Sequence, residues 1–136
     1  LKKIENFNEP ALIVEDDIVL KADSLDYLKQ SFLLCSKKFD YIDLGGGCDL
    51  PFYKDDRLIQ NTNKFISLAV PRSRTTAAYM ITPAAAKKLA IGIFPITMPI
   101  DWQYQYIFKK MNFKVSWSYP SGFIHGSQKH FKSSIN

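Results

Sequence analysis

The sequence predicts an α/β domain in which a mixed sheet is flanked by helices. Short apolar runs typical of strands alternate with longer segments that repeat apolar residues at helical spacing. Glycine, proline and helix-capping residues lie between these segments. The first apolar run ends directly in three acidic residues, which is typical of the ligand-binding edge of an open α/β sheet.

The length of the chain limits what it can form. Its 136 residues, 46% of them hydrophobic, are enough for one core but few for a complete nucleotide-using enzyme. The opening segment, with Leu1 in place of a methionine, resembles the tail of a helix. We therefore expect one domain, or part of one, that lacks its N-terminal portion.

Eighteen basic and thirteen acidic residues give a net charge of +5. This charge favours anionic partners such as nucleotide phosphates, phosphorylated glycans or an anionic membrane face. Nucleic acid is not expected as a partner, because fifteen of the basic residues are lysine and no RNA-binding aromatic signature appears. No apolar stretch approaches the ~20 residues that cross a bilayer, and no signal-peptide pattern opens the chain. We expect a cytoplasmic protein whose association with a membrane would be peripheral.

The first strand and the first helix are predicted from residues 11–37. The four aliphatic residues Ala11–Val14 suit a strand buried on both faces. Asp23 or Ser24 is a suitable N-cap for the helix that follows. The apolar face of this helix carries Leu25, Leu28, Phe32 and Cys35. The spacing between Cys35 and Cys48 matches no metal or redox motif, so both are predicted to be free thiols in a reducing compartment.

Three further strands are predicted in the middle of the chain. Residues 39–44 alternate in the manner of a strand that the glycines at 45–47 end. Residues 48–63 are polar and irregular, which predicts a surface loop or a loose hairpin. Residues 64–70 and 77–81 are apolar runs and complete this group of strands.

Two helices and a last strand are predicted beyond residue 81. Thr82 as N-cap and Pro83 in the first turn begin a helix that ends at Gly92. A proline-rich extended segment leads to Asp101, which opens a helix that ends near Asn112. Residues 115–119 alternate as the last predicted strand, and the tail that follows carries both histidines.

Glu15, Asp16 and Asp17 form the most informative motif. Three adjacent carboxylates repel one another, and a divalent cation with oxygen ligands relieves that repulsion. On an extended backbone Glu15 and Asp17 would point to the same side and Asp16 to the other. The motif therefore predicts a metal-assisted or phosphoryl chemistry at the end of the first strand.

Four separated motifs carry a resemblance to a known family. In order along the chain they are residues 11–20 (ALIVEDDIVL), 75–89 (TTAAYMITPAAAKKL), 99–101 (PID) and 120–135. With these motifs the chain resembles glycosyltransferase family 25, which includes bacterial lipopolysaccharide and lipooligosaccharide galactosyl- and glucosyltransferases and the collagen galactosyltransferases. Residues 1–136 look like roughly the C-terminal two-thirds of the family domain.

The resemblance implies a GT-A type, Rossmann-like fold and an inverting transfer of galactose or glucose from a UDP-sugar to a glycan acceptor. It also implies a divalent ion, usually manganese, and a place in bacterial lipopolysaccharide or lipooligosaccharide biosynthesis. Residues 15–17 take the place of the Asp-x-Asp element, with Asp17 as metal ligand and Glu15 and Asp16 at the donor. Asp101 is the candidate general base, His125 a second metal ligand, and Gln128 a candidate contact to the diphosphate.

Ordinary structural roles remain open for several of these residues. Asp101 could be no more than an N-cap, and His125 could be a structural histidine. Trp102 could stack on a sugar ring or lie in the core. Arg72 and Arg74 could hold a phosphate or an acidic acceptor, or be ordinary surface charges.

Two other classes of protein compete for the same acidic motif. In a phosphoryl-accepting receiver domain Asp43 would take the place of the phosphorylated aspartate. The distance from Asp17 to Asp43 leaves room for a single helix, however, and the expected Lys-Pro pair is missing. The other alternative is a non-catalytic fragment that binds a sugar or a partner.

Overall fold

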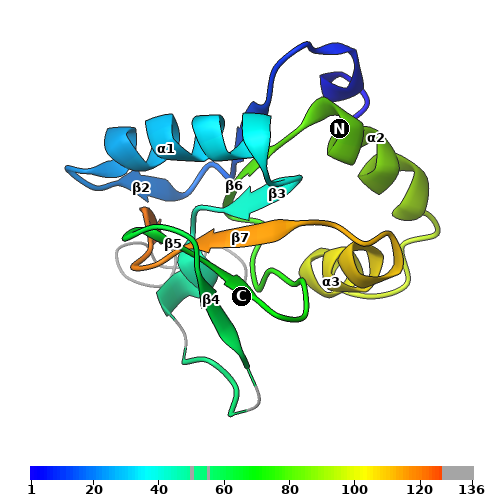
Figure 1. Ribbon diagram of the computed structural model, residues 1–136. Helices are drawn as coiled ribbons and strands as arrows, with labels where there is room; N and C mark the ends of the chain where they lie inside the picture. The colour runs from blue at the N-terminus through cyan, green and yellow to red at the C-terminus, as the bar shows by residue number, and fades with distance from the viewer. Residues whose placement is uncertain (50, 55, 127–136) are drawn as a thin grey trace.

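The computed structural model describes residues 1–49, 51–54 and 56–126 (Figure 1). Its strands are β1 (Ala11–Val14), β2 (Ile18–Leu20), β3 (Tyr41–Asp43), β4 (Leu58–Gln60), β5 (Phe65–Leu68), β6 (Ala78–Ile81), β7 (Val115–Ser118) and β8 (Phe123–His125). Its α-helices are α1 (Ser24–Lys37), α2 (Pro83–Gly92) and α3 (Ile100–Lys110), and two 3-10 turns span Ile4–Asn6 and Gly46–Asp49.

The strands form a six-stranded sheet in the order β1-β6-β3-β7-β5-β4 and a two-stranded sheet of β2 and β8. β3 and β7 pair in parallel, and the other neighbours pair antiparallel. The predicted mixed α/β fold is therefore confirmed. Because β1 and β3 both oppose β6, the strands β1, β3 and β7 run in one direction. Their carboxyl ends meet at one edge of the sheet, where ligands of such folds bind.

Side chains that alternate along the strands build a core on each face of the sheet. On one face Tyr41, Ile81 and Trp117 belong to a cluster with Leu89 of α2 and Phe108 of α3. On the other face residues of β3, β5 and β6 pack with α1; among them are Ile42, Phe65, Met80, Tyr27 and Cys35. In Figure 1 the central strands lie between α1 and the pair formed by α2 and α3.

Several predicted boundaries are confirmed. The hydroxyl of Thr82 accepts a hydrogen bond from the backbone N–H of Ala85, and α2 then begins at Pro83 and ends at Gly92. Helix α3 ends at Lys110, and Asn112 follows it with a φ of 53°. Cys35 is a free thiol as predicted, and burial raises its pKa to about 12.

The prediction that β1 is buried on both faces is wrong. Among the described residues β1 pairs with β6 alone and lies at the edge of the sheet. Leu12 and Val14 are therefore 41% and 48% exposed, while Ala11 and Ile13 on the other face are partly buried.

The predicted apolar face of α1 is confirmed for Cys35, which is buried, and for Leu28 and Phe32, which pack against the core, but not for Leu25. Leu25 is exposed, and the helix buries Ser24, Tyr27, Ser31 and Cys35. The reason is a long-range contact: the hydroxyl of Ser24 donates a hydrogen bond to the carbonyl of Gly122 at 2.7 Å. A Cβ on Gly122 would lie 2.7 Å from the ring of Tyr27, so the ring packs directly on this glycine.

Three strands lie outside the sequence-based assignment: β2, β4 and β8. The residues 115–119 do not form the last strand, because β8 follows and pairs with β2. Within residues 48–63, β4 pairs antiparallel with β5, so the hairpin alternative was the better one.

Candidate functional site

The candidate site begins where the chain leaves β1 at Glu15. The backbone N–H of Glu15 donates to the carbonyl of Ala77 at 2.8 Å, which extends the pairing with β6 by one residue. The hydroxyl of Thr76 donates to Oε1 of Glu15 at 2.9 Å. Asp16 and Asp17 then form a turn rather than the extended backbone that their alternation assumed. Glu15 is thus fixed at the edge of the large sheet.

The small sheet brings His125 to this turn. In the β2–β8 register His125 lies opposite Ile18, and the N–H of Gly126 donates to the carbonyl of Asp17 at 2.8 Å. Nδ1 of His125 is consequently 3.3 Å from Oδ2 of Asp17, and Nε2 is 3.5 Å from Oε2 of Glu15. Three residues that are distant in sequence therefore converge on one point.

These three side chains fit a divalent cation. One potential ligand atom from each of Glu15, Asp17 and His125 lies within 4.8 Å of the others. Nδ1 of His125 is shielded from solvent and forms no hydrogen bond with any residue that the structure describes. Two carboxylates and an imidazole are ligands that manganese accepts. A cation at this point would also relieve the repulsion between the two carboxylates of Glu15 and Asp17.

Asp101 lines the same cavity as Glu15 and His125. The volume of this cavity is about 390 Å³. Its lining consists of Glu15, Cys48, Arg74, Thr75, Thr76, Ala77, Pro99, Ile100, Asp101 and His125. Asp101 lies in the first turn of α3, where its Oδ1 accepts a hydrogen bond from the N–H of Trp102 at 3.0 Å. The N-cap of α3 is Pro99, so the alternative that Asp101 is only an N-cap is wrong.

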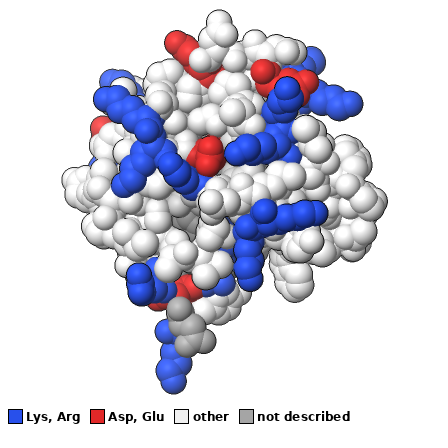
Figure 2. Space-filling view, turned by 45° about the vertical axis from the view of Figure 1, so that its right-hand side comes forward, with Lys and Arg blue, Asp and Glu red and all other residues white. Residues whose placement is uncertain are grey.

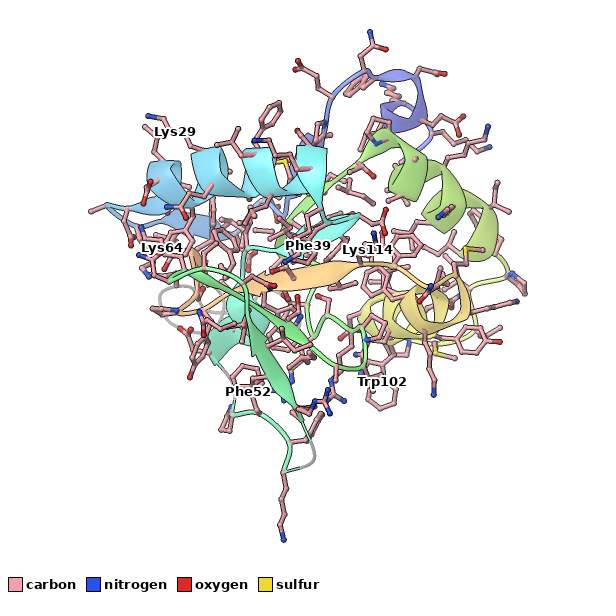
Figure 3. The ribbon with its side chains drawn as sticks, in the orientation of Figure 1. Lys29, Phe39, Phe52, Lys64, Trp102 and Lys114 are labelled. Carbon is pink, nitrogen blue, oxygen red and sulfur yellow. The ribbon has the colours of Figure 1, made fainter. Side chains whose placement is uncertain are left out.

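The other sequence-based candidates lie apart from this group. Asp16 is exposed on the turn and is not among the three converging side chains. Gln128 lies outside the described residues. Trp102 is 63% exposed, so its burial in the core is excluded. Figure 3 shows its side chain directed away from the strands.

Arg74 is a cavity residue whose role the sequence left open. Its side chain is 8% exposed, and its guanidinium carbon lies 4.6 Å from the ring centre of Tyr53 and 5.7 Å from that of Trp117. Asp56 pairs with Arg72 and lies 3.7 Å from Nη2 of Arg74. Burial and the nearby charge of Arg74 lower the pKa of Arg72. Two guanidinium groups thus share one described carboxylate, and of the two Arg74 lines the cavity.

Asp43 is connected through Ser73 to Thr75, which lines the cavity. Asp43 is fully buried, and Oγ of Ser73 lies 2.8 Å from its Oδ2 and 2.8 Å from the carbonyl of Thr75. Burial raises the pKa of Asp43 to about 6, against the opposing effects of Ser73 and the backbone amides of the adjacent glycines. A carboxylate without access to solvent does not suit a phosphoryl acceptor, which argues against the receiver alternative.

Comparison with known families assigns the chain to one of them. Residues 2–103 match the model of glycosyltransferase family 25, described as an LPS biosynthesis protein. The chain therefore belongs to glycosyltransferase family 25. No curated protein matches the chain. The family match includes Glu15, Asp17 and Asp101 but ends before His125, whose place beside Asp17 is a finding of the structure.

Proposed function

We propose that this protein is a metal-dependent, inverting glycosyltransferase of the GT-A type. It transfers a galactosyl or glucosyl group from a UDP-sugar to a glycan acceptor in bacterial lipopolysaccharide or lipooligosaccharide biosynthesis. The observation that carries the proposal is the cavity that Asp101 shares with Glu15 and His125, two of the three residues of the proposed cation site. Family membership supports sugar transfer as the reaction.

Asp17 and His125 are the proposed ligands of a manganese ion, and Glu15 completes the group. When bound, this ion would offset the negative charge on the departing UDP. Thr76 holds the carboxylate of Glu15 through its hydroxyl, which orients Glu15 toward the ion or the ribose. Asp16 keeps the donor-binding role predicted from the sequence, and so does Gln128, which lies outside the described residues.

Asp101 is the proposed general base. Its Oδ1 is already engaged by the N–H of Trp102, and no hydrogen bond to Oδ2 is found among the described residues. Oδ2 would accept the proton of the acceptor hydroxyl as the oxygen of that hydroxyl bonds to the anomeric carbon. The bond between that carbon and UDP breaks in the same step, and UDP leaves with its electron pair. Attack from the face opposite UDP inverts the anomeric configuration.

Calorimetric titration with UDP tests the proposed donor site. UDP should bind in the presence of Mn²⁺ and not in the presence of EDTA. The variant Asp17→Asn should lose Mn²⁺-dependent binding. Asp23→Asn is the matched control, because it removes an exposed carboxylate at the start of α1 whose side chain caps nothing.

The titration and two further assays distinguish the alternatives. Equal binding of UDP with and without Mn²⁺ would contradict the metal-dependent site. A receiver domain would instead become labelled by acetyl phosphate on Asp43. A non-catalytic fragment would fail to transfer sugar even with Mn²⁺ and donor present.

A further inference from the structure

An exposed apolar surface lies beside the cavity, along the connection from α2 to α3. We define the α2–α3 surface by its exposed side chains: Ile91, Phe94, Ile96, Met98, Ile100, Trp102 and Tyr106. Every residue from 94 to 100 is exposed. Ile91 and Phe94 are 69% and 68% exposed, values that the core-forming side chains of this protein do not approach. Apolar patches of this kind mark sites of interaction with proteins or membranes.

The backbone beneath this surface is held in place by one buried side chain. Gln103 is 5% exposed. Its amide nitrogen donates to the carbonyls of Ile93 and Pro95, and its Oε1 accepts a hydrogen bond from the N–H of Thr97 at 3.0 Å. The polar groups of the connection are thus satisfied on the inside, and its apolar side chains point outward. The hydrogen bonds of Gln103 therefore fix the conformation of the backbone that carries this surface.

Lysines flank the α2–α3 surface along the sequence. Residues 82–114 contain five lysines and a single acidic residue, Asp101, which opens into the cavity. Lys87 and Lys88 precede Ile91 by one helical turn, and Lys109 and Lys110 follow Tyr106 by one turn. Nζ of Lys110 lies 5.8 Å from the ring centre of Tyr106. Figure 2 brings this side of the molecule forward and shows several Lys and Arg side chains beside an uncharged area.

We propose that the α2–α3 surface docks on an anionic lipid bilayer. Exposed aliphatic and aromatic side chains with lysines around them are the pattern by which proteins lie in the interface of a membrane. Lysines near an anionic leaflet add attraction that neutral lipids do not provide. No helix in the described part of the chain is long and apolar enough to span a membrane. Contact through this surface would therefore be peripheral.

The position of the surface also suits the proposed acceptor; this step rests on the proposed function. Pro99 and Ile100 belong to the exposed connection and also line the cavity that contains Asp101. Docking would therefore place the mouth of the cavity at the level of the lipid head groups. A glycan carried on a lipid anchor could then reach Asp101 while its anchor stays in the bilayer.

Trp102 provides a reporter for the experiment. The chain has two tryptophans, and Trp117 is fully buried while Trp102 is exposed. Vesicles of phosphatidylethanolamine with phosphatidylglycerol as the anionic lipid should bind the protein and shift the emission of Trp102 to the blue. Vesicles of phosphatidylcholine should bind at least about tenfold more weakly, since two lysines contribute roughly this much on an anionic surface.

Substitutions assign the binding to this surface. The double variant Ile91→Ser/Ile96→Ser should reduce binding to the anionic vesicles at least about tenfold. Leu25→Ser/Leu33→Ser is the matched control, because it removes two exposed leucines from α1 on the opposite face of the sheet. Trp102→Phe should abolish the blue shift while vesicle flotation persists.

Three results would overturn the proposal. They are failure of the wild type to bind anionic vesicles, equal losses in the two double variants, and concentration-dependent dimerisation that Ile91→Ser/Ile96→Ser abolishes without any vesicle binding. The last would assign the surface to a second copy of the chain. UDP binding measured on the same variants keeps this test separate, because it depends on the metal site and not on lipid.

Discussion

Nδ1 of His125 lies 3.3 Å from Oδ2 of Asp17, although the two residues come from opposite ends of the described chain. The contact depends on the pairing of β2 with β8, which places His125 opposite Ile18. The proposed cation site therefore exists only after the last described strand has joined the fold. Metal binding and the structure of residues 123–125 should be coupled.

His125→Gln should weaken the affinity for Mn²⁺ at least about tenfold, because it removes an imidazole and leaves two carboxylates to hold the ion. Titration with Mn²⁺ followed by electron paramagnetic resonance measures the affinity directly. Circular dichroism should be unchanged, since the pairing of β8 uses backbone groups. Wild-type affinity in this variant would exclude His125 as a ligand.

Asp101→Asn should reduce sugar transfer by roughly 10²–10⁴-fold while UDP binding stays within about twofold. The amide oxygen of asparagine can still accept the hydrogen bond from Trp102, so the first turn of α3 should be retained. Release of UDP in the presence of a donor sugar and an acceptor glycan measures transfer, and calorimetry measures binding. Turnover equal to that of the wild type would refute the assignment of Asp101 as base.

The sequence predicted those parts of the site that depend on local signals. Glu15 and Asp17 follow an apolar strand, and α2 begins at its capping threonine as expected. The convergence of His125 on Asp17 had no local signal, because β8 is three residues long and its register is set by a partner far away in the chain.

The face that α1 buries also depends on a residue that is distant in the sequence, Gly122. Helical periodicity favoured Leu25 at the core, but the hydrogen bond from Ser24 to Gly122 and the contact of Tyr27 with Gly122 turn the helix. Arg74 shows the same limit. An arginine in a polar loop is usually solvated. Arg74 is instead buried by contacts with Tyr53 and Trp117, which the sequence does not predict.

Gly46→Ala should destabilise the fold by roughly 2 kcal/mol or more. Gly46 has a φ of +55°, and a Cβ there would lie 2.5 Å from the backbone carbonyl of Ser118. Gly45→Ala is the control: its Cβ would contact the side chains of Thr75 and Asp43 at 3.2 and 3.3 Å and would need no left-handed backbone. Urea unfolding of both variants should rank Gly46→Ala as the less stable, and the reverse order would contradict this account of the turn.

The burial of Asp43 makes a specific prediction about pH. Its pKa is raised from 3.8 to about 6 in the folded protein, so the folded state favours the protonated carboxyl. The contribution of Asp43 to stability is therefore most favourable below about pH 4 and is lost as the pH rises through 6. The loss amounts to about 3 kcal/mol. Asp43→Asn stays neutral and should escape it.

Urea unfolding of the wild type and Asp43→Asn at a series of pH values measures this difference. Relative to the variant, the free energy of unfolding of the wild type should fall by about 2 kcal/mol between pH 4 and 6.5, which is most of the full loss. Ser73→Ala removes a hydrogen bond that lowers the pKa of Asp43, so in that variant the loss should occur at higher pH. Parallel curves for the wild type and Asp43→Asn would show that Asp43 does not titrate in this range. The hydrogen bonds that lower the pKa of Asp43 would then outweigh the burial that raises it.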